Sequence, residues 1–259
     1  MPIEPATHAT ILRAAKVLAG GGVVAFPTET VYGLGADATS AEAVLRVYEM
    51  KGRPRFNPLI AHVADIETAG AHGHFNAPAR KLAQAFWPGP LTIVLNRRAE
   101  SGICDLVPAG LETIALRVPA NKIARGLLRA AGCPVAAPSA NRAGHVSPTT
   151  ASHVAADLGE GPEIILDGGD TALGLESTVV DLSGPDPRLL RPGGLAREEI
   201  EDALGVKLGN AEPGDRPASP GQLASHYAPR ARLRLEAISV EPGEALLALA
   251  GEIDGGNVT

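Results

Sequence analysis

Residues 23–35 read VVAFPTETVYGLG. The apolar run Val23–Phe26 predicts a short buried β-strand, which Pro27 ends because proline cannot donate to a sheet ladder. Polar residues and glycines follow as far as Gly35 and predict a loop, the kind of segment on which binding and catalytic residues concentrate. We expect this unit, a buried strand that opens into a polar loop, to recur along the chain.

Further apolar runs predict strands at Leu59–Val63, Leu91–Leu95, Ile114–Val118, Val135–Ala137, Ile164–Leu166 and Thr178–Leu182. Helices are predicted at 7–19, 39–52, 77–86, 121–131, 150–158 and 198–204, the second with Thr39 and Glu42 at the spacing of a capping box. Helices and strands interleave, but short strand-to-strand connections favour a mixed sheet over a purely parallel one. The predicted fold class is α+β, with a large, twisted, mostly mixed β-sheet flanked by helices.

The length and composition indicate how the chain is divided. Its 259 residues suit one large or two unequal domains, and 45% hydrophobic residues allow a sizeable core. The 30 Gly and 22 Pro predict an ordered protein that is rich in shaped loops. A polar stretch with many Pro and Gly begins after Leu208. We therefore expect a complete domain at 1–208, a linker at 209–230, and the beginning of a further domain at 231–259.

Several classes of protein are disfavoured. No apolar run reaches the roughly 18 residues of a membrane-spanning helix, and no secretory signal is visible at the N-terminus. Cys104 and Cys133, without a CxxC motif, predict neither a disulfide framework nor a zinc site. A net charge of −6 disfavours non-specific coating of nucleic acid, which depends on phosphate neutralisation. The expected location is the cytoplasm, with no membrane contact and no strong direct binding of nucleic acid.

Three cations, Lys51, Arg53 and Arg55, lie close together at the end of a predicted helix. Cations at this position can simply offset the negative end of the helix dipole. Alternatively, Lys51 and Arg53 can form a phosphate clamp, in which Arg offers a fork to two oxygens and Lys a point charge. The spacing alone supports both interpretations.

Other polar groups follow predicted strands. Residues 138–149 carry Ser139 and Asn141, which suit ribose or phosphate oxygens but could equally form a turn before the next helix. His62 lies within an apolar strand, where a histidine is usually part of the core. His72 and His74 could bind a metal, but no third ligand is at a suitable spacing, so we predict no metal site.

Several motifs together carry a family resemblance. They are 27–35, Lys51-Gly52-Arg53 with Asn57-Pro58-Leu59, His62, WPGPLT (87–92), LRVP (116–119), PSAN (138–141), STVVD (177–181) and LRPG (190–193). In this order the chain resembles the YrdC-like threonylcarbamoyl-AMP synthases over about residues 7–207. SPGQ (219–222) and HYAP (226–229) further resemble the linker of the long, two-domain form. That form continues well beyond Thr259, so 231–259 is expected to be the beginning of a truncated C-terminal domain.

The resemblance implies a YrdC-like fold, with 1–208 as the catalytic domain and 209–230 as a lid over the active site. The implied enzyme is an L-threonylcarbamoyladenylate synthase, a nucleotidyltransferase. It makes threonylcarbamoyl-AMP and pyrophosphate from L-threonine, bicarbonate or CO2, and ATP, for the threonylcarbamoyladenosine (t6A) modification of tRNA. Mg²⁺ would accompany ATP, and the product could be handed to the tRNA threonylcarbamoyl transferase complex.

The resemblance also implies two sets of site residues. Lys51 and Arg53 would be catalytic. The ATP-binding set is Lys51, Arg53, Asn57, Thr113, Ser139, Asn141, Ser147, Arg191 and Tyr227. The threonine-binding set is Thr30, His62, Arg117, Ala137 and Ser177.

Two alternatives stay open at this point. One is a carbamoyl-adenylate-forming module of a hydrogenase maturation factor, although the acylphosphatase-like and zinc-finger parts of those longer chains are not apparent in this sequence. The other is a non-catalytic RNA-binding module, which the acidic net charge and the 3% of aromatic residues oppose.

Overall fold

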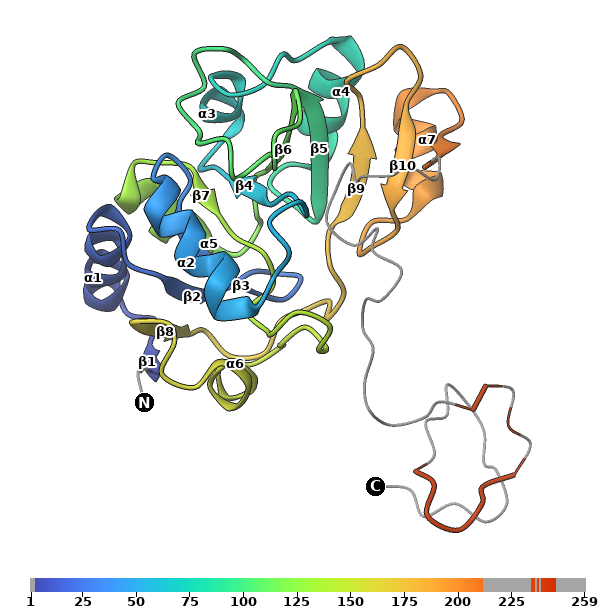
Figure 1. The fold of residues 1–259 in the computed structure, drawn as a ribbon. Coiled ribbons are helices and arrows are strands. Elements are labelled where there is room, and N and C mark those ends of the chain that lie inside the picture. Colours follow the sequence, from blue (N-terminus) through green and yellow to red (C-terminus); the bar gives the residue numbers. More distant parts are fainter. Residues whose placement is uncertain (1–2, 212–233, 236, 238, 246–259) are drawn as a thin grey trace. The chain divides into compact units, whose positions relative to one another are not determined.

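The computed structural model describes residues 3–211, 234–235, 237 and 239–245 (Figure 1). The chain divides into two compact units, Met1–Ala228 and Pro229–Thr259. The described helices and strands all belong to the first unit. Most of the predicted linker, Tyr227 included, lies outside the described residues, so the division at residues 208 and 230 stays a prediction.

The described strands form one mixed sheet, as predicted. Their order is β1-β8-β2-β3-β7-β4-β6-β5-β9-β10-β11, with both parallel and antiparallel neighbours. The strands are β1 (Ile3–Pro5), β2 (Val24–Pro27), β3 (Tyr32–Asp37), β4 (Ile60–His62), β5 (Leu91–Asn96), β6 (Thr113–Arg117), β7 (Val135–Ala136), β8 (Ile164–Asp167), β9 (Thr178–Asp181), β10 (Arg188–Arg191) and β11 (Gly209–Asn210).

All the predicted helices are present, together with one that was not predicted, α3. The helices are α1 (His8–Ala19), α2 (Ala41–Lys51), α3 (Ile66–Gly70), α4 (Ala77–Phe86), α5 (Lys122–Ala131), α6 (Ala151–Leu158) and α7 (Arg197–Leu204). The predicted cap of α2 is wrong, because Ser40 and not Thr39 accepts from an N–H of the first turn. Thr39 instead donates to the Asp37 carboxylate at 2.8 Å. None of these helices is long and apolar enough to cross a membrane.

The loop predicted up to Gly35 is the main error in the fold. From Tyr32 onward the segment is strand β3, which pairs antiparallel with β2 and β7. Glycine is needed there because a Cβ at Gly35 would lie 2.7 Å from both Phe26 and Val135. Gly35 therefore makes room for the Phe26 ring within the sheet, and only residues 28–31 connect the strands.

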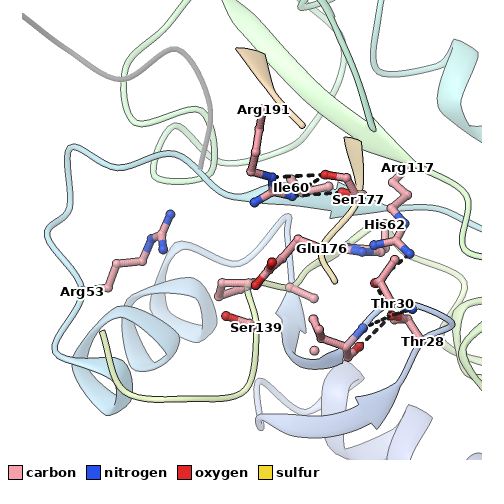
Figure 2. A pocket seen from close by; sticks show the side chains of 14 residues that line it. Thr28, Thr30, Arg53, Ile60, His62, Arg117, Ser139, Glu176, Ser177 and Arg191 are labelled. Carbon is pink, nitrogen blue, oxygen red and sulfur yellow. Dashed lines mark hydrogen bonds between the residues drawn. The ribbon is translucent and has the colours of Figure 1, made fainter. Parts of the chain in front are cut away.

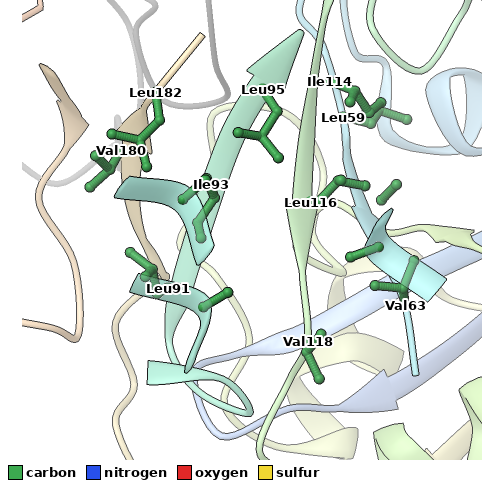
Figure 3. Packing of buried hydrophobic residues seen from close by; sticks show 14 of the residues in the cluster. Leu59, Val63, Leu91, Ile93, Leu95, Ile114, Leu116, Val118, Val180 and Leu182 are labelled. Carbon is green, nitrogen blue, oxygen red and sulfur yellow. The ribbon is translucent and has the colours of Figure 1, made fainter. Parts of the chain in front are cut away.

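Helices cover the two faces of the sheet unequally. In one half, α1 and α5 pack on one face of β2 and β8, and α2 and α6 pack on the other. In the half formed by β4, β6, β5 and β9, helices α4 and α7 share one core with the residues of these strands and their ends that Figure 3 shows. The opposite face of that half carries a small buried cluster of strand residues alone, namely Ile60, Val94, Ala115 and Val179.

Candidate functional site

The alternation of side chains along a strand places polar groups on this uncovered face. His62 follows Ile60 by two residues on β4, and Arg117 follows Ala115 by two on β6. The parallel register aligns both pairs, because Ile60 lies opposite Ala115 and His62 opposite Arg117. Ser177 lies directly before β9 and two residues before Val179, which places it on the same face. The register thus gathers His62, Arg117 and Ser177 around one hollow.

Two adjoining cavities occupy this region. The first cavity (Figure 2) is lined by Thr28, Thr30, Val31, Gly33, Arg53, Ile60, His62, Arg117, Ala137, Pro138, Ser139, Glu176, Ser177 and Arg191. The second cavity is lined by Lys51, Gly52, Arg53, Pro54, Asn57, Ser139, Asn141, Ala143, Gly144 and His145. Arg53 and Ser139 line both cavities and so form the wall between them.

Arg53 is held between the cavities by the end of helix α2. Gly52 adopts a left-handed conformation (φ 60°), and the Arg53 N–H donates back to the Tyr48 carbonyl at 2.9 Å. The guanidinium donates to the Asn57 carbonyl at 3.2 Å and the Pro58 carbonyl at 2.8 Å. Burial lowers the pKa of Arg53 to about 10, so the group stays positively charged at neutral pH. A fixed cation thus stands where the two cavities meet.

Lys51 lies buried beside Arg53 and donates to backbone carbonyls of another segment. Its Nζ contacts the Ser139 carbonyl at 2.6 Å and also the Asn141 carbonyl. Burial, and then the positive charge of Arg53, lower the pKa of Lys51 to about 7. The lysine therefore ties α2 to the loop after β7 and does not merely offset the helix dipole. An anion bound next to it would raise its pKa again.

Arg117 forms a buried ion pair with Glu29. Its Nη2 donates to Glu29 Oε1 at 2.6 Å and to Thr30 Oγ1 at 3.0 Å. Glu29 Oε2 accepts from the backbone N–H groups of Ala120 and Asn121, at 2.9 and 3.3 Å. The side chains of Arg117 and Glu29 are 4% and 12% exposed. The charge of Arg117 is therefore balanced within the protein, and the orientation of its guanidinium is fixed.

His62 is buried in the first cavity as a neutral ring. Burial and the positive charge of Arg117 lower its pKa to about 3. Its Nδ1 has no hydrogen-bond partner among the described residues, and its ring meets Phe26 edge-on at 6.3 Å between centroids. At physiological pH it can thus exchange neutral hydrogen bonds with a ligand, but it brings no charge.

Replacing His62 with glutamine is expected to change the acid stability of the protein. The unfolded chain protonates His62 below about pH 6.5, whereas the folded protein does so only near pH 3. The unfolded state thus binds more protons in this window, and His62 contributes stability that is lost as the pH falls through it. Between pH 7.5 and 4.5 the free energy of unfolding, measured by urea denaturation, should fall by about 2–3 kcal/mol more in the wild type than in His62→Gln. The exposed His8→Gln is the control, and equal losses in wild type and His62→Gln would contradict the expectation.

Ser177 and Arg191 close the other side of the first cavity (Figure 2). Ser177 Oγ lies 2.8 Å from Thr92 Oγ1, and Arg191 Nη2 donates to the hydroxyl and the carbonyl of Ser177 at 3.1 and 2.9 Å. Ser147 lines neither cavity but donates to the carboxylate of Glu176, which lines the first.

Two buried amide oxygens accompany the cations of the second cavity. Asn141 donates its Nδ2 to the carbonyls of Arg142 and His145, both at 2.8 Å. Within the described part of the chain, its Oδ1 and that of Asn57 are buried without a hydrogen-bond partner. These oxygens are available to a hydrogen-bond donor of a ligand.

Most of the predicted site residues line one of the two cavities. Thr30, His62, Arg117, Ala137, Ser177 and Arg191 line the first, Lys51, Asn57 and Asn141 line the second, and Arg53 and Ser139 line both. Thr113 does not join them, because it begins β6 at the end opposite Arg117. Tyr227 lies outside the described residues. In the described chain, no three His, Cys, Asp or Glu side chains are placed to hold a metal.

Three polar residues at or beside the first cavity were not predicted: Thr28 and Glu176, which line it, and Glu29, which pairs with Arg117. Each is a direct neighbour of the predicted part, since Thr28 and Glu29 precede Thr30 and Glu176 precedes Ser177. Their place beside Thr30 and Ser177 in polar segments that follow or precede strands was the available signal.

The fold and the cavities together define an α+β protein with a pocket of fixed cations and hydroxyls. Residues 16–193 match the Sua5/YciO/YrdC family model, described as "Telomere recombination". Residues 195–252 match the model described as "Threonylcarbamoyl-AMP synthase, C-terminal domain". The chain belongs to the Sua5/YciO/YrdC family, as its motifs predict.

Named relatives share much of the chain. A threonylcarbamoyl-AMP synthase of Bacillus subtilis (strain 168) is 47% identical over 229 residues, which cover 87% of this chain and 66% of that protein. A threonylcarbamoyl-AMP synthase of Pyrococcus abyssi is 47% identical over 225 residues, or 85% and 66% of the two chains. The crystal structure of P. abyssi Sua5 complexed with L-threonine has a TM-score of 0.83 and 45% identity, and covers 88% of this chain and 68% of that one. The chain thus spans slightly less than two thirds of the length of these curated relatives.

Proposed function

We propose that the protein is a threonylcarbamoyl-AMP synthase, which joins L-threonine, bicarbonate or CO2, and ATP into threonylcarbamoyl-AMP and releases pyrophosphate. The supporting observation is that a cavity lined by hydroxyl groups, His62 and arginines adjoins a second cavity lined by Lys51 and two asparagines, with Arg53 and Ser139 in the wall between them. The relatives reported above carry this name, and one solved relative was crystallised with L-threonine.

The first cavity suits the amino acid and the second suits the triphosphate. Thr30, His62 and Ser177 offer neutral hydrogen-bonding groups of the size of the threonine side chain. Lys51 and Arg53 are held by backbone carbonyls, so they can bind phosphate oxygens without reorganising. We assign the α-phosphate to the shared wall, because a carbamate formed in the first cavity has to reach the α-phosphorus of an ATP molecule bound in the second.

In the proposed reaction, the amine of threonine first takes up CO2, or bicarbonate with loss of water, and forms a carbamate. A carbamate oxygen then attacks the α-phosphorus of ATP. The bond from phosphorus to the bridging oxygen breaks, and pyrophosphate leaves with the electron pair. The protein's part is to hold three anionic groups together and to stabilise the leaving pyrophosphate, which positioning and the fixed charge of Arg53 can supply.

Several finer assignments belong to the same proposal. Mg²⁺ would enter with ATP, coordinated by its phosphate oxygens and water, and no step above is assigned to it. Ser147 would act through Glu176, and the lid with Tyr227 would close the site. The enzyme would work in the cytoplasm and pass its product to the tRNA threonylcarbamoyl transferase complex for t6A formation.

The function is tested by measuring pyrophosphate release with one substrate omitted at a time. Release should require ATP, L-threonine and bicarbonate together. Valine should not be used, because a site that hydrogen-bonds a hydroxyl rejects an analogue that lacks it. Serine, which keeps the hydroxyl but lacks the methyl group, should be used less well than threonine. Release that does not depend on threonine would contradict the proposal.

Matched variants and alternative substrates complete this test. Arg53→Met should lose most of the release, while Arg55→Met, whose side chain is 64% exposed and lines neither of these cavities, should retain it. Release from ATP with carbamoyl phosphate in place of threonine and bicarbonate would indicate the maturation-factor alternative. RNA binding without any release would indicate the RNA-binding alternative.

A further inference from the structure

A line of hydrogen bonds runs along the wall of the first cavity from Arg117 to a backbone carbonyl. Arg117 donates to Thr30 Oγ1 at 3.0 Å, and Thr30 Oγ1 lies 2.7 Å from Thr28 Oγ1. Thr28 Oγ1 in turn lies 2.6 Å from the Val31 carbonyl oxygen. Both hydroxyls are buried at the cavity wall (Figure 2), and the reaction proposed above assigns no role to Thr28.

The chemistry of the two ends, together with the short distances of 2.6 and 2.7 Å, indicates the direction of the bonds in this line. A carbonyl oxygen can only accept, so the hydroxyl of Thr28 donates its one proton to the carbonyl oxygen of Val31. The contact between the two hydroxyls then carries the proton of Thr30, donated to one lone pair of Thr28, and the longer contacts from the Thr30 and Val31 N–H groups, at 3.1 and 3.2 Å, share the other. A guanidinium can only donate, so Thr30 accepts from Arg117.

Thr30 therefore faces the cavity with a lone pair and without a proton. A hydroxyl oxygen has two lone pairs, and Arg117 occupies one of them. The remaining lone pair can accept a hydrogen bond from a ligand, but it repels a carboxylate or an ether oxygen placed against it.

We propose that Thr28 is a positioning residue for substrate selection, because it takes the proton of Thr30 and makes Thr30 an acceptor for the hydroxyl proton of the amino acid. The proposal rests on the proposed function, since it concerns how the same site chooses threonine. It assigns the substrate hydroxyl to Thr30 as a donor and places the substrate carboxylate elsewhere in the cavity.

Glu29 supports this arrangement from the other end. Its carboxylate holds the same Arg117 nitrogen that donates to Thr30, and two backbone N–H groups hold its other oxygen. Arg117 is thereby kept in the orientation that fills one lone pair of Thr30.

The main test is the binding of L-threonine and L-valine to Thr28→Val, measured by titration calorimetry in the presence of ATP. Valine has the shape of threonine with a methyl group in place of the hydroxyl. Without Thr28 as its acceptor, the Thr30 proton is no longer held away from the ligand. Threonine should then bind about tenfold more weakly while the weak binding of valine stays unchanged, so that the preference for threonine falls. Thr28→Ser, which keeps the hydroxyl, should restore the wild-type preference to within about threefold.

A purely structural role of Thr28 gives a different result. Thr28 Oγ1 also accepts from the backbone N–H groups of Thr30 and Val31, so its loss could disturb the turn. Such a disturbance would weaken both ligands equally and leave their ratio unchanged, and that outcome would overturn the proposal. A double-mutant cycle adds a second criterion, because in a Thr30→Val background the additional Thr28→Val change should not alter the preference further.

A second measurement on the wild-type protein keeps the proposal testable if Thr28→Val does not fold. O-Methyl-L-serine is an isomer of threonine whose side-chain oxygen can accept but not donate. It should bind at least tenfold more weakly than L-serine, whereas binding as tight as that of serine would overturn the proposal. If pyrophosphate release does not depend on threonine at all, the proposed function fails. If release depends on threonine but the preference survives in Thr28→Val, only the present inference fails.

Discussion

Replacing Gly193 with alanine is expected to lower the free energy of unfolding by about 3 kcal/mol or more. A Cβ at this position would lie 2.3 Å from the Glu176 carbonyl oxygen, 2.5 Å from the Ser177 carbonyl carbon and 2.6 Å from the Thr178 nitrogen. All three are backbone atoms at the start of β9, so no side chain can turn aside to make room. The displaced segment carries Glu176 and Ser177, and pyrophosphate release should fall with stability.

Denaturation in urea measures this loss, and the chain offers a matched control. A Cβ at Gly184 would meet no other atom within 4 Å, and the backbone there is not left-handed. Gly184→Ala should therefore change stability by less than about 0.5 kcal/mol. Equal stabilities of Gly193→Ala and Gly184→Ala would contradict the close contact of residues 192–194 with the backbone at the start of β9.

Replacing Arg117 with methionine is expected to cost about 3–5 kcal/mol of stability and to abolish threonine binding. The change leaves the Glu29 carboxylate buried without its cation, and two backbone N–H groups offset that charge only in part. It also removes the donor to Thr30. Chemical denaturation gives the stability, and calorimetry with L-threonine gives the binding.

A double variant separates the uncompensated charge from the lost packing. Arg117→Met combined with Glu29→Gln should recover part of the stability, because the buried charge is then gone. The exposed pair of Arg13 and Glu4 is the control, and Arg13→Met should cost no more than about 1 kcal/mol. Equal costs for Arg117→Met and Arg13→Met would contradict the assignment of a buried pair.

The sequence was informative where local chemistry determines the structure. Helices α4, α5 and α6 have the predicted bounds to within one residue, because Asn76, Asn121 and Thr150 accept from N–H groups of the first turn as capping residues do. The interior strands were predicted because their continuous apolar runs are also a local feature of the sequence. Their mixed arrangement followed from the short connections between them.

Prediction failed where a distant residue decides. Strand β3 was missed because the reason for its glycines is the space required by Phe26 and Val135, which lie elsewhere in the chain. The role of Lys51 as a tie to the 139–141 carbonyls depends on contacts about 90 positions away in sequence. Glu29 was missed likewise, because its partner Arg117 lies 88 positions away in sequence and is brought near it by the pairing of β3, β7, β4 and β6.

The uncovered face of β4, β6 and β9 makes the binding site sensitive to strand alignment. Along these strands, residues that face the cavities alternate with residues that face the core, so that His62 follows Ala61 and Arg117 follows Leu116. A slip of one residue between neighbouring strands would exchange these sets, burying a charge and exposing a leucine to the substrates. The hydrophobic core on one face of the sheet therefore requires the same strand register as the cavity on the other face. A chain that packs this core in the wrong register does not bring His62, Arg117 and Ser177 together.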